Sequence, residues 1–315
     1  MTNYWQVDRI NSYLMGNLLS GTSVPTAPHP LSAGRKWQVW TEIVFISICH
    51  QANWDRLHDR IIEVASDNLL ELHPSNLCRM EPGQFRKLFA PGLDSSRMRT
   101  GERIKLLQCL GEKACGWLSE TGGSWLDDES ITLAGKEGVY SWLNKVPVFA
   151  EDPIQKKSRI LIHQLLRYGL VIVADPQNIA PAVDYHIIRL YVRTARVRPL
   201  KGELMERLKA GGTARVEFIT SLRKAVEEAM YYSAAGAGVR IDELNHIEWQ
   251  IARSFCVRQE ALCHCGPLTE KPIDEMVLTL SCKAGGGCPY ANDCQGALDA
   301  QLRGIVDPQS IKSYY

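Results

Sequence analysis

The sequence predicts an all-α fold, and two observations support this prediction. Apolar residues recur at spacings of three and four almost everywhere, whereas strict alternation of apolar and polar residues is nearly absent. The chain has 315 residues, of which 45% are hydrophobic, and this is enough for one large or two medium domains with a real core. We therefore expect a folded, mainly helical protein.

Charge and hydropathy exclude several classes of protein. Lys and Arg number 36 and Asp and Glu number 35, so the chain is neither disordered nor a bulk polycation, and any nucleic-acid surface must be local. The longest uncharged apolar runs, residues 43–49 and 170–174, are far shorter than the roughly 20 residues that cross a bilayer. The N-terminus lacks the pattern of a secretory signal. We expect a cytoplasmic protein without a membrane helix.

Helical patterns and breakers divide the chain into four parts. A Pro, Ser, Thr and Gly stretch at residues 21–34 is expected to be a linker after a short N-terminal helix. Helices are then expected at residues 40–49, 54–70, 96–118 and 136–146. The expected parts are an extension and linker (1–36), a helical lobe (37–135), a hairpin and catalytic lobe (136–240), and a C-terminal helix with a cysteine region (241–315).

Three acidic residues mark the starts of later helices. Asp152 is placed to cap a helix with Pro153 at its first position, and Lys157 then lies one turn from the positive end of the helix dipole. Asp184 introduces the helix YHIIRLYVRTA. A third helix is expected to begin near Asp242, and a cysteine-rich region follows it.

Cysteine placement indicates a metal centre. Six of the ten cysteines lie within 39 residues: Cys256, Cys263, Cys265, Cys282, Cys288 and Cys294. In a cytosolic chain disulfides are disfavoured, and thiolate binding to a metal is the usual reason for such density. The other four cysteines sit mostly among apolar residues, where we expect them to be structural.

Three stretches form a recognisable set: TEIVFISICHQANWDRLHDRI (41–61), LNKVPVFAEDPIQKKSRILIHQLL (143–166) and PAVDYHIIR (181–189). They resemble an early helix pair, a hairpin with its following helix, and the Val-Asp-x-His-Val-x-Arg element of the helix-hairpin-helix DNA glycosylase superfamily, the endonuclease III and 8-oxoguanine glycosylase group. In that family hairpin amides hold a DNA phosphate, and glycine permits the close approach. Here Val148 and Ala150 replace the hairpin glycines. The archaeal 8-oxoguanine glycosylases also lack the glycine pattern, and the chain resembles that subfamily.

The cysteine spacing adds to the resemblance. Cys256-x6-Cys263 and Cys288-x5-Cys294 reproduce the first and last intervals of the iron–sulfur loop of endonuclease III relatives, with a longer middle interval of 24 residues. The resemblance implies a [4Fe–4S] cluster on these four cysteines. Zinc held by a different four, drawing on Cys265 and Cys282, is the alternative.

The resemblance implies a two-lobed DNA glycosylase that flips a base out of the duplex and has lyase activity. Asp184 would be the catalytic carboxylate, which stabilises an oxocarbenium-like species, and Lys157 the amine that traps C1′ as a Schiff base. Burial, Lys156 and the helix N-terminus are expected to lower the pKa of that amine. The implied substrate is an oxidised purine such as 8-oxoguanine, and a hypermodified base of foreign or phage DNA is an open alternative.

Local charge suggests where DNA binds. Residues 153–224 contain 14 Lys and Arg but 5 Asp and Glu, an excess expected of a phosphate-binding face. The residues expected to contact DNA are Gln51, Asn53, Lys156, Arg159, His186, Arg189, Arg193 and Arg196, with Arg198 on the same stripe. We expect a nucleoid-associated monomer whose partner is double-stranded DNA containing a modified base.

A different interpretation is a non-enzymatic nucleic-acid-binding protein in which the cysteines form a structural clip. Without the family, Asp184 is most simply a helix N-cap and Lys157 a solvated lysine of a first helical turn.

Overall fold

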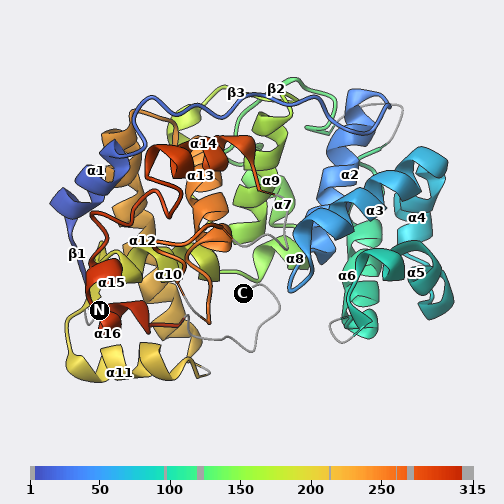
Figure 1. The fold of residues 1–315 in the computed structure, drawn as a ribbon. Coiled ribbons are helices and arrows are strands. Elements are labelled where there is room, and N and C mark those ends of the chain that lie inside the picture. The colour runs from blue at the N-terminus through green and yellow to red at the C-terminus, as the bar shows by residue number, and fades with distance from the viewer. Residues whose placement is uncertain are drawn as a thin grey trace. The chain divides into compact units, whose positions relative to one another are not determined.

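The computed structural model describes residues 4–95, 98–118, 124–212, 214–259, 261–267 and 273–306 (Figure 1). These residues are mostly helical, as the sequence predicts. They form two compact units. One unit is Pro25–Ile179, and the other combines residues 4–24 with the described residues from 180 to 306. This division differs from the expected boundaries at 36, 135 and 240. Within the described ranges no helix is both long and apolar enough to cross a membrane.

The unit Pro25–Ile179 is built around α2, whose residues from 39 to 48 are all buried. Its helices are α2 (Arg35–Ile48), α3 (Trp54–Asp67), α4 (Pro74–Leu77), α5 (Pro82–Phe89), α6 (Thr100–Lys113), α7 (Val139–Leu143), α8 (Pro147–Ala150) and α9 (Lys156–Arg167). Strands β2 (Ser130–Ile131) and β3 (Ile172–Val173) pair in parallel. The helix expected at 136–146 is shorter than predicted. Residues 96–97, where the helix at 96–118 was expected to begin, lie outside the described residues.

A buried charged cluster ties residues 25–34 to this core. Glu42 of α2 is fully buried, and one of its oxygens lies 3.0 Å from Nε2 of His29 and 2.7 Å from Nε2 of His58. Nδ1 of His29 accepts a hydrogen bond from the backbone N–H of Leu31, so its Nε2 carries the hydrogen. Burial works against charge on Glu42, but the two histidines hold its pKa below the usual value. The expected linker is therefore anchored at His29.

Stability should depend on pH through this cluster. Burial opposes charge on His58, but Glu42 raises its pKa above 6.5, while the pKa of Glu42 lies below 4.5. The ion pair therefore stabilises the fold fully between about pH 4.5 and pH 6.5. This contribution is lost as the pH rises through the folded pKa of His58 or falls through the folded pKa of Glu42. Urea unfolding between about pH 6 and pH 9 should therefore show a loss of stability that Glu42→Gln lacks. Parallel curves for the two proteins would contradict this prediction.

The second unit joins both ends of the chain. Its helices are α1 (Arg9–Asn17), α10 (Tyr185–Arg193), α11 (Gly202–Ala210), α12 (Val216–Ala237), α13 (Ile241–Ser254), α14 (Glu275–Lys283), α15 (Gln295–Leu298) and α16 (Ala300–Arg303). Strand β1 (Trp5–Val7) pairs antiparallel with β4 (Val197–Pro199). Helix α1 lies directly against α12, where a Cβ on Gly16 would come within 2.0 Å of the carbonyl of Ser233. Glycine allows this close crossing.

An ion pair lies in the interior of this unit. Glu248 of α13 and Arg196 are fully buried and 2.5 Å apart. The hydroxyls of Tyr191 and Tyr290 donate to the same carboxylate, at 2.5 and 2.8 Å. The guanidinium lies 3.6 Å from the ring centroid of Tyr191. These contacts compensate the desolvation of both charges.

Candidate functional site

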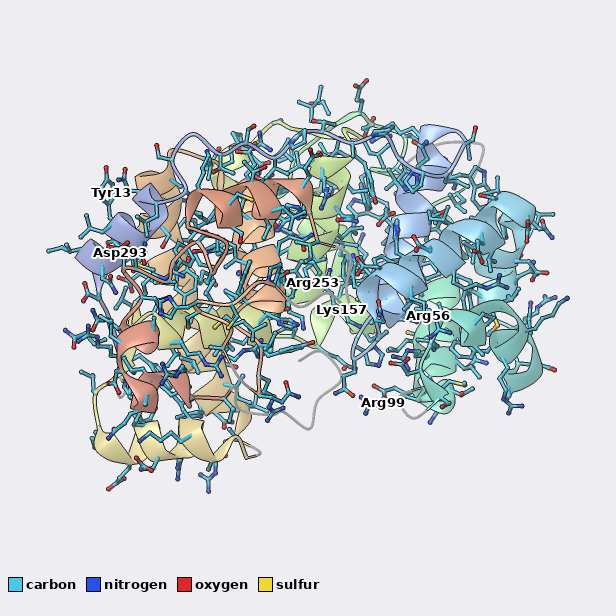
Figure 2. All side chains as sticks on the ribbon, viewed as in Figure 1. Tyr13, Arg56, Arg99, Lys157, Arg253 and Asp293 are labelled. Atoms are coloured by element: carbon cyan, nitrogen blue, oxygen red, sulfur yellow. The ribbon has the colours of Figure 1, made fainter. Side chains whose placement is uncertain are left out.

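Lys157 lies near the N-terminus of α9, with its amine inside the unit Pro25–Ile179 (Figure 2). The residue is 2% exposed, and its Nζ donates a hydrogen bond to the carbonyl of Ser47, 2.9 Å away at the end of α2. Burial lowers the pKa of the amine to about 8, and the charge of Lys156 acts in the same direction. A large share of the amine is therefore uncharged at mildly alkaline pH, as a nucleophile must be.

The loop after α2 carries Gln51 and Asn53. Arg103 of α6 holds this loop by donating to the carbonyls of Ile48 at 3.0 Å and His50 at 2.6 Å. Burial lowers the pKa of His50 to about 2, so its ring is neutral. Gln51 is exposed with a φ of 52°, and Asn53 is exposed and caps α3. Both residues are surface turn residues.

Asp152 does not begin a helix, so that prediction was wrong. Its carboxylate accepts hydrogen bonds from the backbone N–H of Ile154 at 3.1 Å and of Lys156 at 2.9 Å, forming a turn. Helix α9 starts only at Lys156, after Gln155 with a φ of 52°. The backbone N–H groups of Ile154 and Lys156 are thus bound by the chain's own carboxylate.

Asp184 belongs to the other unit, where it caps α10. Its Oδ1 accepts a hydrogen bond from the backbone N–H of Ile187 at 3.0 Å, and its Oδ2 accepts one from the indole N–H of Trp249 at 3.1 Å. The residue is half-buried. The N-cap interpretation is confirmed. Trp249 was not anticipated, because it lies 65 positions further along the chain and no spacing rule links it to Asp184.

The expected stripe of arginines is not an exposed face. Arg189, Arg193 and Arg196 are between 0 and 2% exposed. Arg189 donates to the carbonyl of Cys256 at 2.6 Å and lies 3.0 Å from the ring of His186. These three guanidinium groups cannot reach a phosphate while the unit is folded, so their assignment to DNA was wrong. The other residues of the stripe are Lys156, which is buried, Arg159, which is partly exposed, and Arg198, which is exposed.

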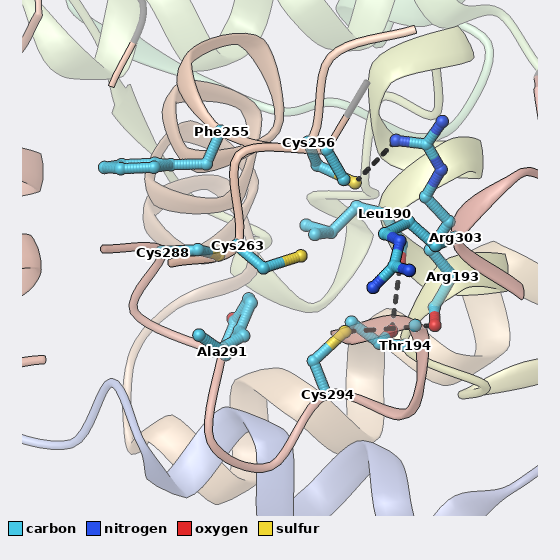
Figure 3. Close-up of a pocket in the computed structure, with 13 residues that line it drawn as sticks. Leu190, Arg193, Thr194, Phe255, Cys256, Cys263, Cys288, Ala291, Cys294 and Arg303 are labelled. Carbon is cyan, nitrogen blue, oxygen red and sulfur yellow. Dashed lines mark hydrogen bonds between the residues drawn. The ribbon is translucent and has the colours of Figure 1, made fainter. Parts of the chain in front are cut away.

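Four cysteines line one pocket in the unit that contains Asp184 (Figure 3): Cys256, Cys263, Cys288 and Cys294. Cys265 and Cys282 are exposed and do not line it. In the described part of the chain, no three His, Cys, Asp or Glu side chains are close enough to hold a metal ion together.

Arg193, at the C-terminal end of α10, holds the chain around this pocket. Its guanidinium lies 3.6 Å from the sulfur of Cys256. It also donates to three backbone carbonyls, those of Val257 at 2.7 Å, Arg258 at 3.2 Å and Ile305 at 2.8 Å. A residue expected to bind phosphate is thus an anchor of the cysteine-bearing loop.

Two loop segments meet closely at the pocket. The backbone N–H of Cys288 donates to the carbonyl of Cys263 at 2.9 Å. A Cβ on Gly287 would come within 2.6 Å of the same oxygen. Glycine is required at this position because any side chain would push the two segments apart.

The surroundings of Cys288 and Cys294 favour the uncharged thiol over the thiolate. Burial raises the pKa of Cys288 well above its usual value and that of Cys294 to about 11, and the other cysteines add to both effects. The backbone N–H groups of Tyr290 and Ala297 act in the opposite direction by donating to these two sulfurs. Such N–H groups are the usual support of thiolate ligands, whose protons leave when metal binds.

No protein-family model matches the chain, and no curated protein matches it. Function is therefore inferred from the chemistry of these side chains.

Proposed function

We propose that the protein is a DNA glycosylase with lyase activity that excises a modified base from duplex DNA. The observation that carries the proposal is the buried amine of Lys157, whose pKa is lowered to about 8. The resemblance at residues 156–158 and 181–189 supports it. Asp184 supports it as well, because its carboxylate is held by two N–H donors at the start of α10.

The reaction assigns one role to each side chain. The target nucleotide leaves the base stack, since its glycosidic bond is inaccessible inside the duplex. As the base departs with the bonding electron pair, positive charge develops on the sugar, and the carboxylate of Asp184 stabilises it. The uncharged amine of Lys157 forms a bond to C1′; one of its protons goes to the ring oxygen O4′ as the sugar ring opens, the other goes to the departing base, and a Schiff base remains. That intermediate leads to strand cleavage.

The proposed substrate is an oxidised purine such as 8-oxoguanine, with a hypermodified base of foreign DNA as the alternative. The proposed partner is double-stranded DNA, bound by a monomer in the cytoplasm at the nucleoid. Arg193 and Arg196 are not part of the proposed DNA surface, because both are buried.

Base release tests the proposal directly. The protein is incubated with duplexes that each carry one modified base and with genomic DNA containing hypermodified bases, and released bases are identified by mass spectrometry. The proposal requires a free base and a strand break at its position. A protein that retards these duplexes in gels but leaves no abasic site is a nucleic-acid-binding protein, and the proposal is then wrong.

We also propose that Cys256, Cys263, Cys288 and Cys294 bind a [4Fe–4S] cluster. The support is that these four thiols, and neither Cys265 nor Cys282, line one pocket. A [4Fe–4S] cluster is usually held by four cysteine thiolates, and four cysteines line this pocket. When bound, the cluster would cross-link the chain between α13 and α15.

The cluster should give a visible signal. Protein purified under nitrogen is expected to be brown and to contain about four iron atoms and four sulfides per chain. Cys294→Ser should remove the colour and lower the unfolding temperature, because a buried ligand is lost. Cys265→Ser and Cys282→Ser are matched controls on exposed cysteines and should stay brown. Colourless protein that contains one zinc ion per chain would contradict the cluster and show that the site binds zinc.

A further inference from the structure

The carboxylate of Asp184 is held from two elements. One oxygen accepts the backbone N–H of Ile187 within α10, a contact that any capping aspartate makes. The other oxygen accepts the indole N–H of Trp249 from α13, at 3.1 Å. The second contact comes from a different helix and constrains the rotation of the carboxylate plane about the bond to Cβ.

Trp249 is itself firmly placed. The guanidinium carbon of Arg253, one helical turn further along α13, lies 4.6 Å from the centroid of its ring. The ring of His186 meets it edge to face, with centroids 6.3 Å apart and an interplanar angle of 81°. Arg253 is 4% exposed, so this stacking is largely shielded from water. An indole held on its face and at its edge presents its N–H in one direction.

We infer that Trp249 is a positioning residue for Asp184, an inference that rests on the proposed function. An indole N–H is a donor without net charge. It orients the carboxylate without the neutralisation that an arginine or lysine partner would cause. A fixed carboxylate plane would point one oxygen at the place where positive charge develops on the sugar.

The test compares two identical substitutions in one unit. Trp249→Phe removes the donor and keeps an aromatic ring for Arg253. Trp5→Phe removes the corresponding donor to Ser221, at 3.0 Å, and is the matched control. The rate of single-turnover base excision should fall about 10- to 100-fold in Trp249→Phe, since the loss of a hydrogen bond to a charged group has an effect of this size. Affinity for DNA should stay within about twofold.

The pH profile separates positioning from general damage. The acidic limb should move to higher pH in Trp249→Phe, because the ionised carboxylate has lost a donor. It should stay in place in Trp5→Phe. Equal losses in the two variants, or an unmoved acidic limb in Trp249→Phe, would overturn the inference.

A measurement without catalysis distinguishes this inference from the proposed function. In the NMR spectrum, Asp184→Asn should shift the indole N–H signal of Trp249, identified by its absence in Trp249→Phe, and leave that of Trp40, which donates to Leu72, in place. If the signal shifts but no duplex yields a released base, the proposed function is wrong, whereas the orientation of the Asp184 carboxylate by Trp249 is supported. An unshifted signal would overturn the inference.

Discussion

Lys157→Met should abolish covalent trapping of the protein on substrate DNA by borohydride. The substitution keeps the length and burial of the side chain but removes the amine whose Schiff base the reagent reduces. Strand cleavage is expected to fall by about a thousandfold or more, as for other nucleophile deletions. Trapping and cleavage are measured on the same duplex, and folding is checked by thermal unfolding.

Lys156→Met is the matched control, because Lys156 is the neighbouring lysine and is also buried. It should remain trappable. In the unmodified protein the trapping rate should rise with pH and level off above about 8, where the amine of Lys157 is mostly uncharged. If Lys157→Met still releases free base, water is the nucleophile and the amine has been misassigned.

Arg196→Met is expected to lower the free energy of unfolding by about 3–5 kcal/mol. The substitution leaves Glu248 fully buried without its ion-pair partner, and an uncompensated buried charge is strongly destabilising. Urea unfolding measures the change.

The neighbouring Arg198→Met supplies the comparison. The side chain of Arg198 is 50% exposed and lies 3.9 Å from Asp8, so its loss should cost less than about 1 kcal/mol. If the two variants were equally stable and both weakened DNA binding, Arg196 would belong to a phosphate-binding face after all.

Local patterns predicted the presence of helices better than the residues at which the helices begin and end. The stripe of α13 is buried at Leu244, Ile247 and Ile251, as the spacing of three and four requires. The start of α9 was misplaced by three residues, because an Asp-Pro pair suits a turn as well as a helix cap. The 22-residue helix α12 was not anticipated.

Long-range partners explain the larger errors. Charge counting identifies a basic segment, but whether an arginine faces water depends on acceptors elsewhere. The partners of Arg193 are carbonyls more than 60 positions away, and those of Arg196 include a glutamate 52 positions away. The cysteine spacing singled out four residues that line one pocket, because each pair is separated by a short loop. The indole that binds Asp184 had no such local signal.

The pairing of β1 with β4 has a consequence for the order in which the chain folds. Trp5 pairs with Pro199, so the first strand gains its partner only after nearly two hundred residues have been synthesised. Residues 25–179, in contrast, make their own compact unit and can fold as they emerge from the ribosome. Closing so long a loop is slow. During synthesis the apolar faces of β1 and α1 therefore stay exposed until α12 has been synthesised and packs against them.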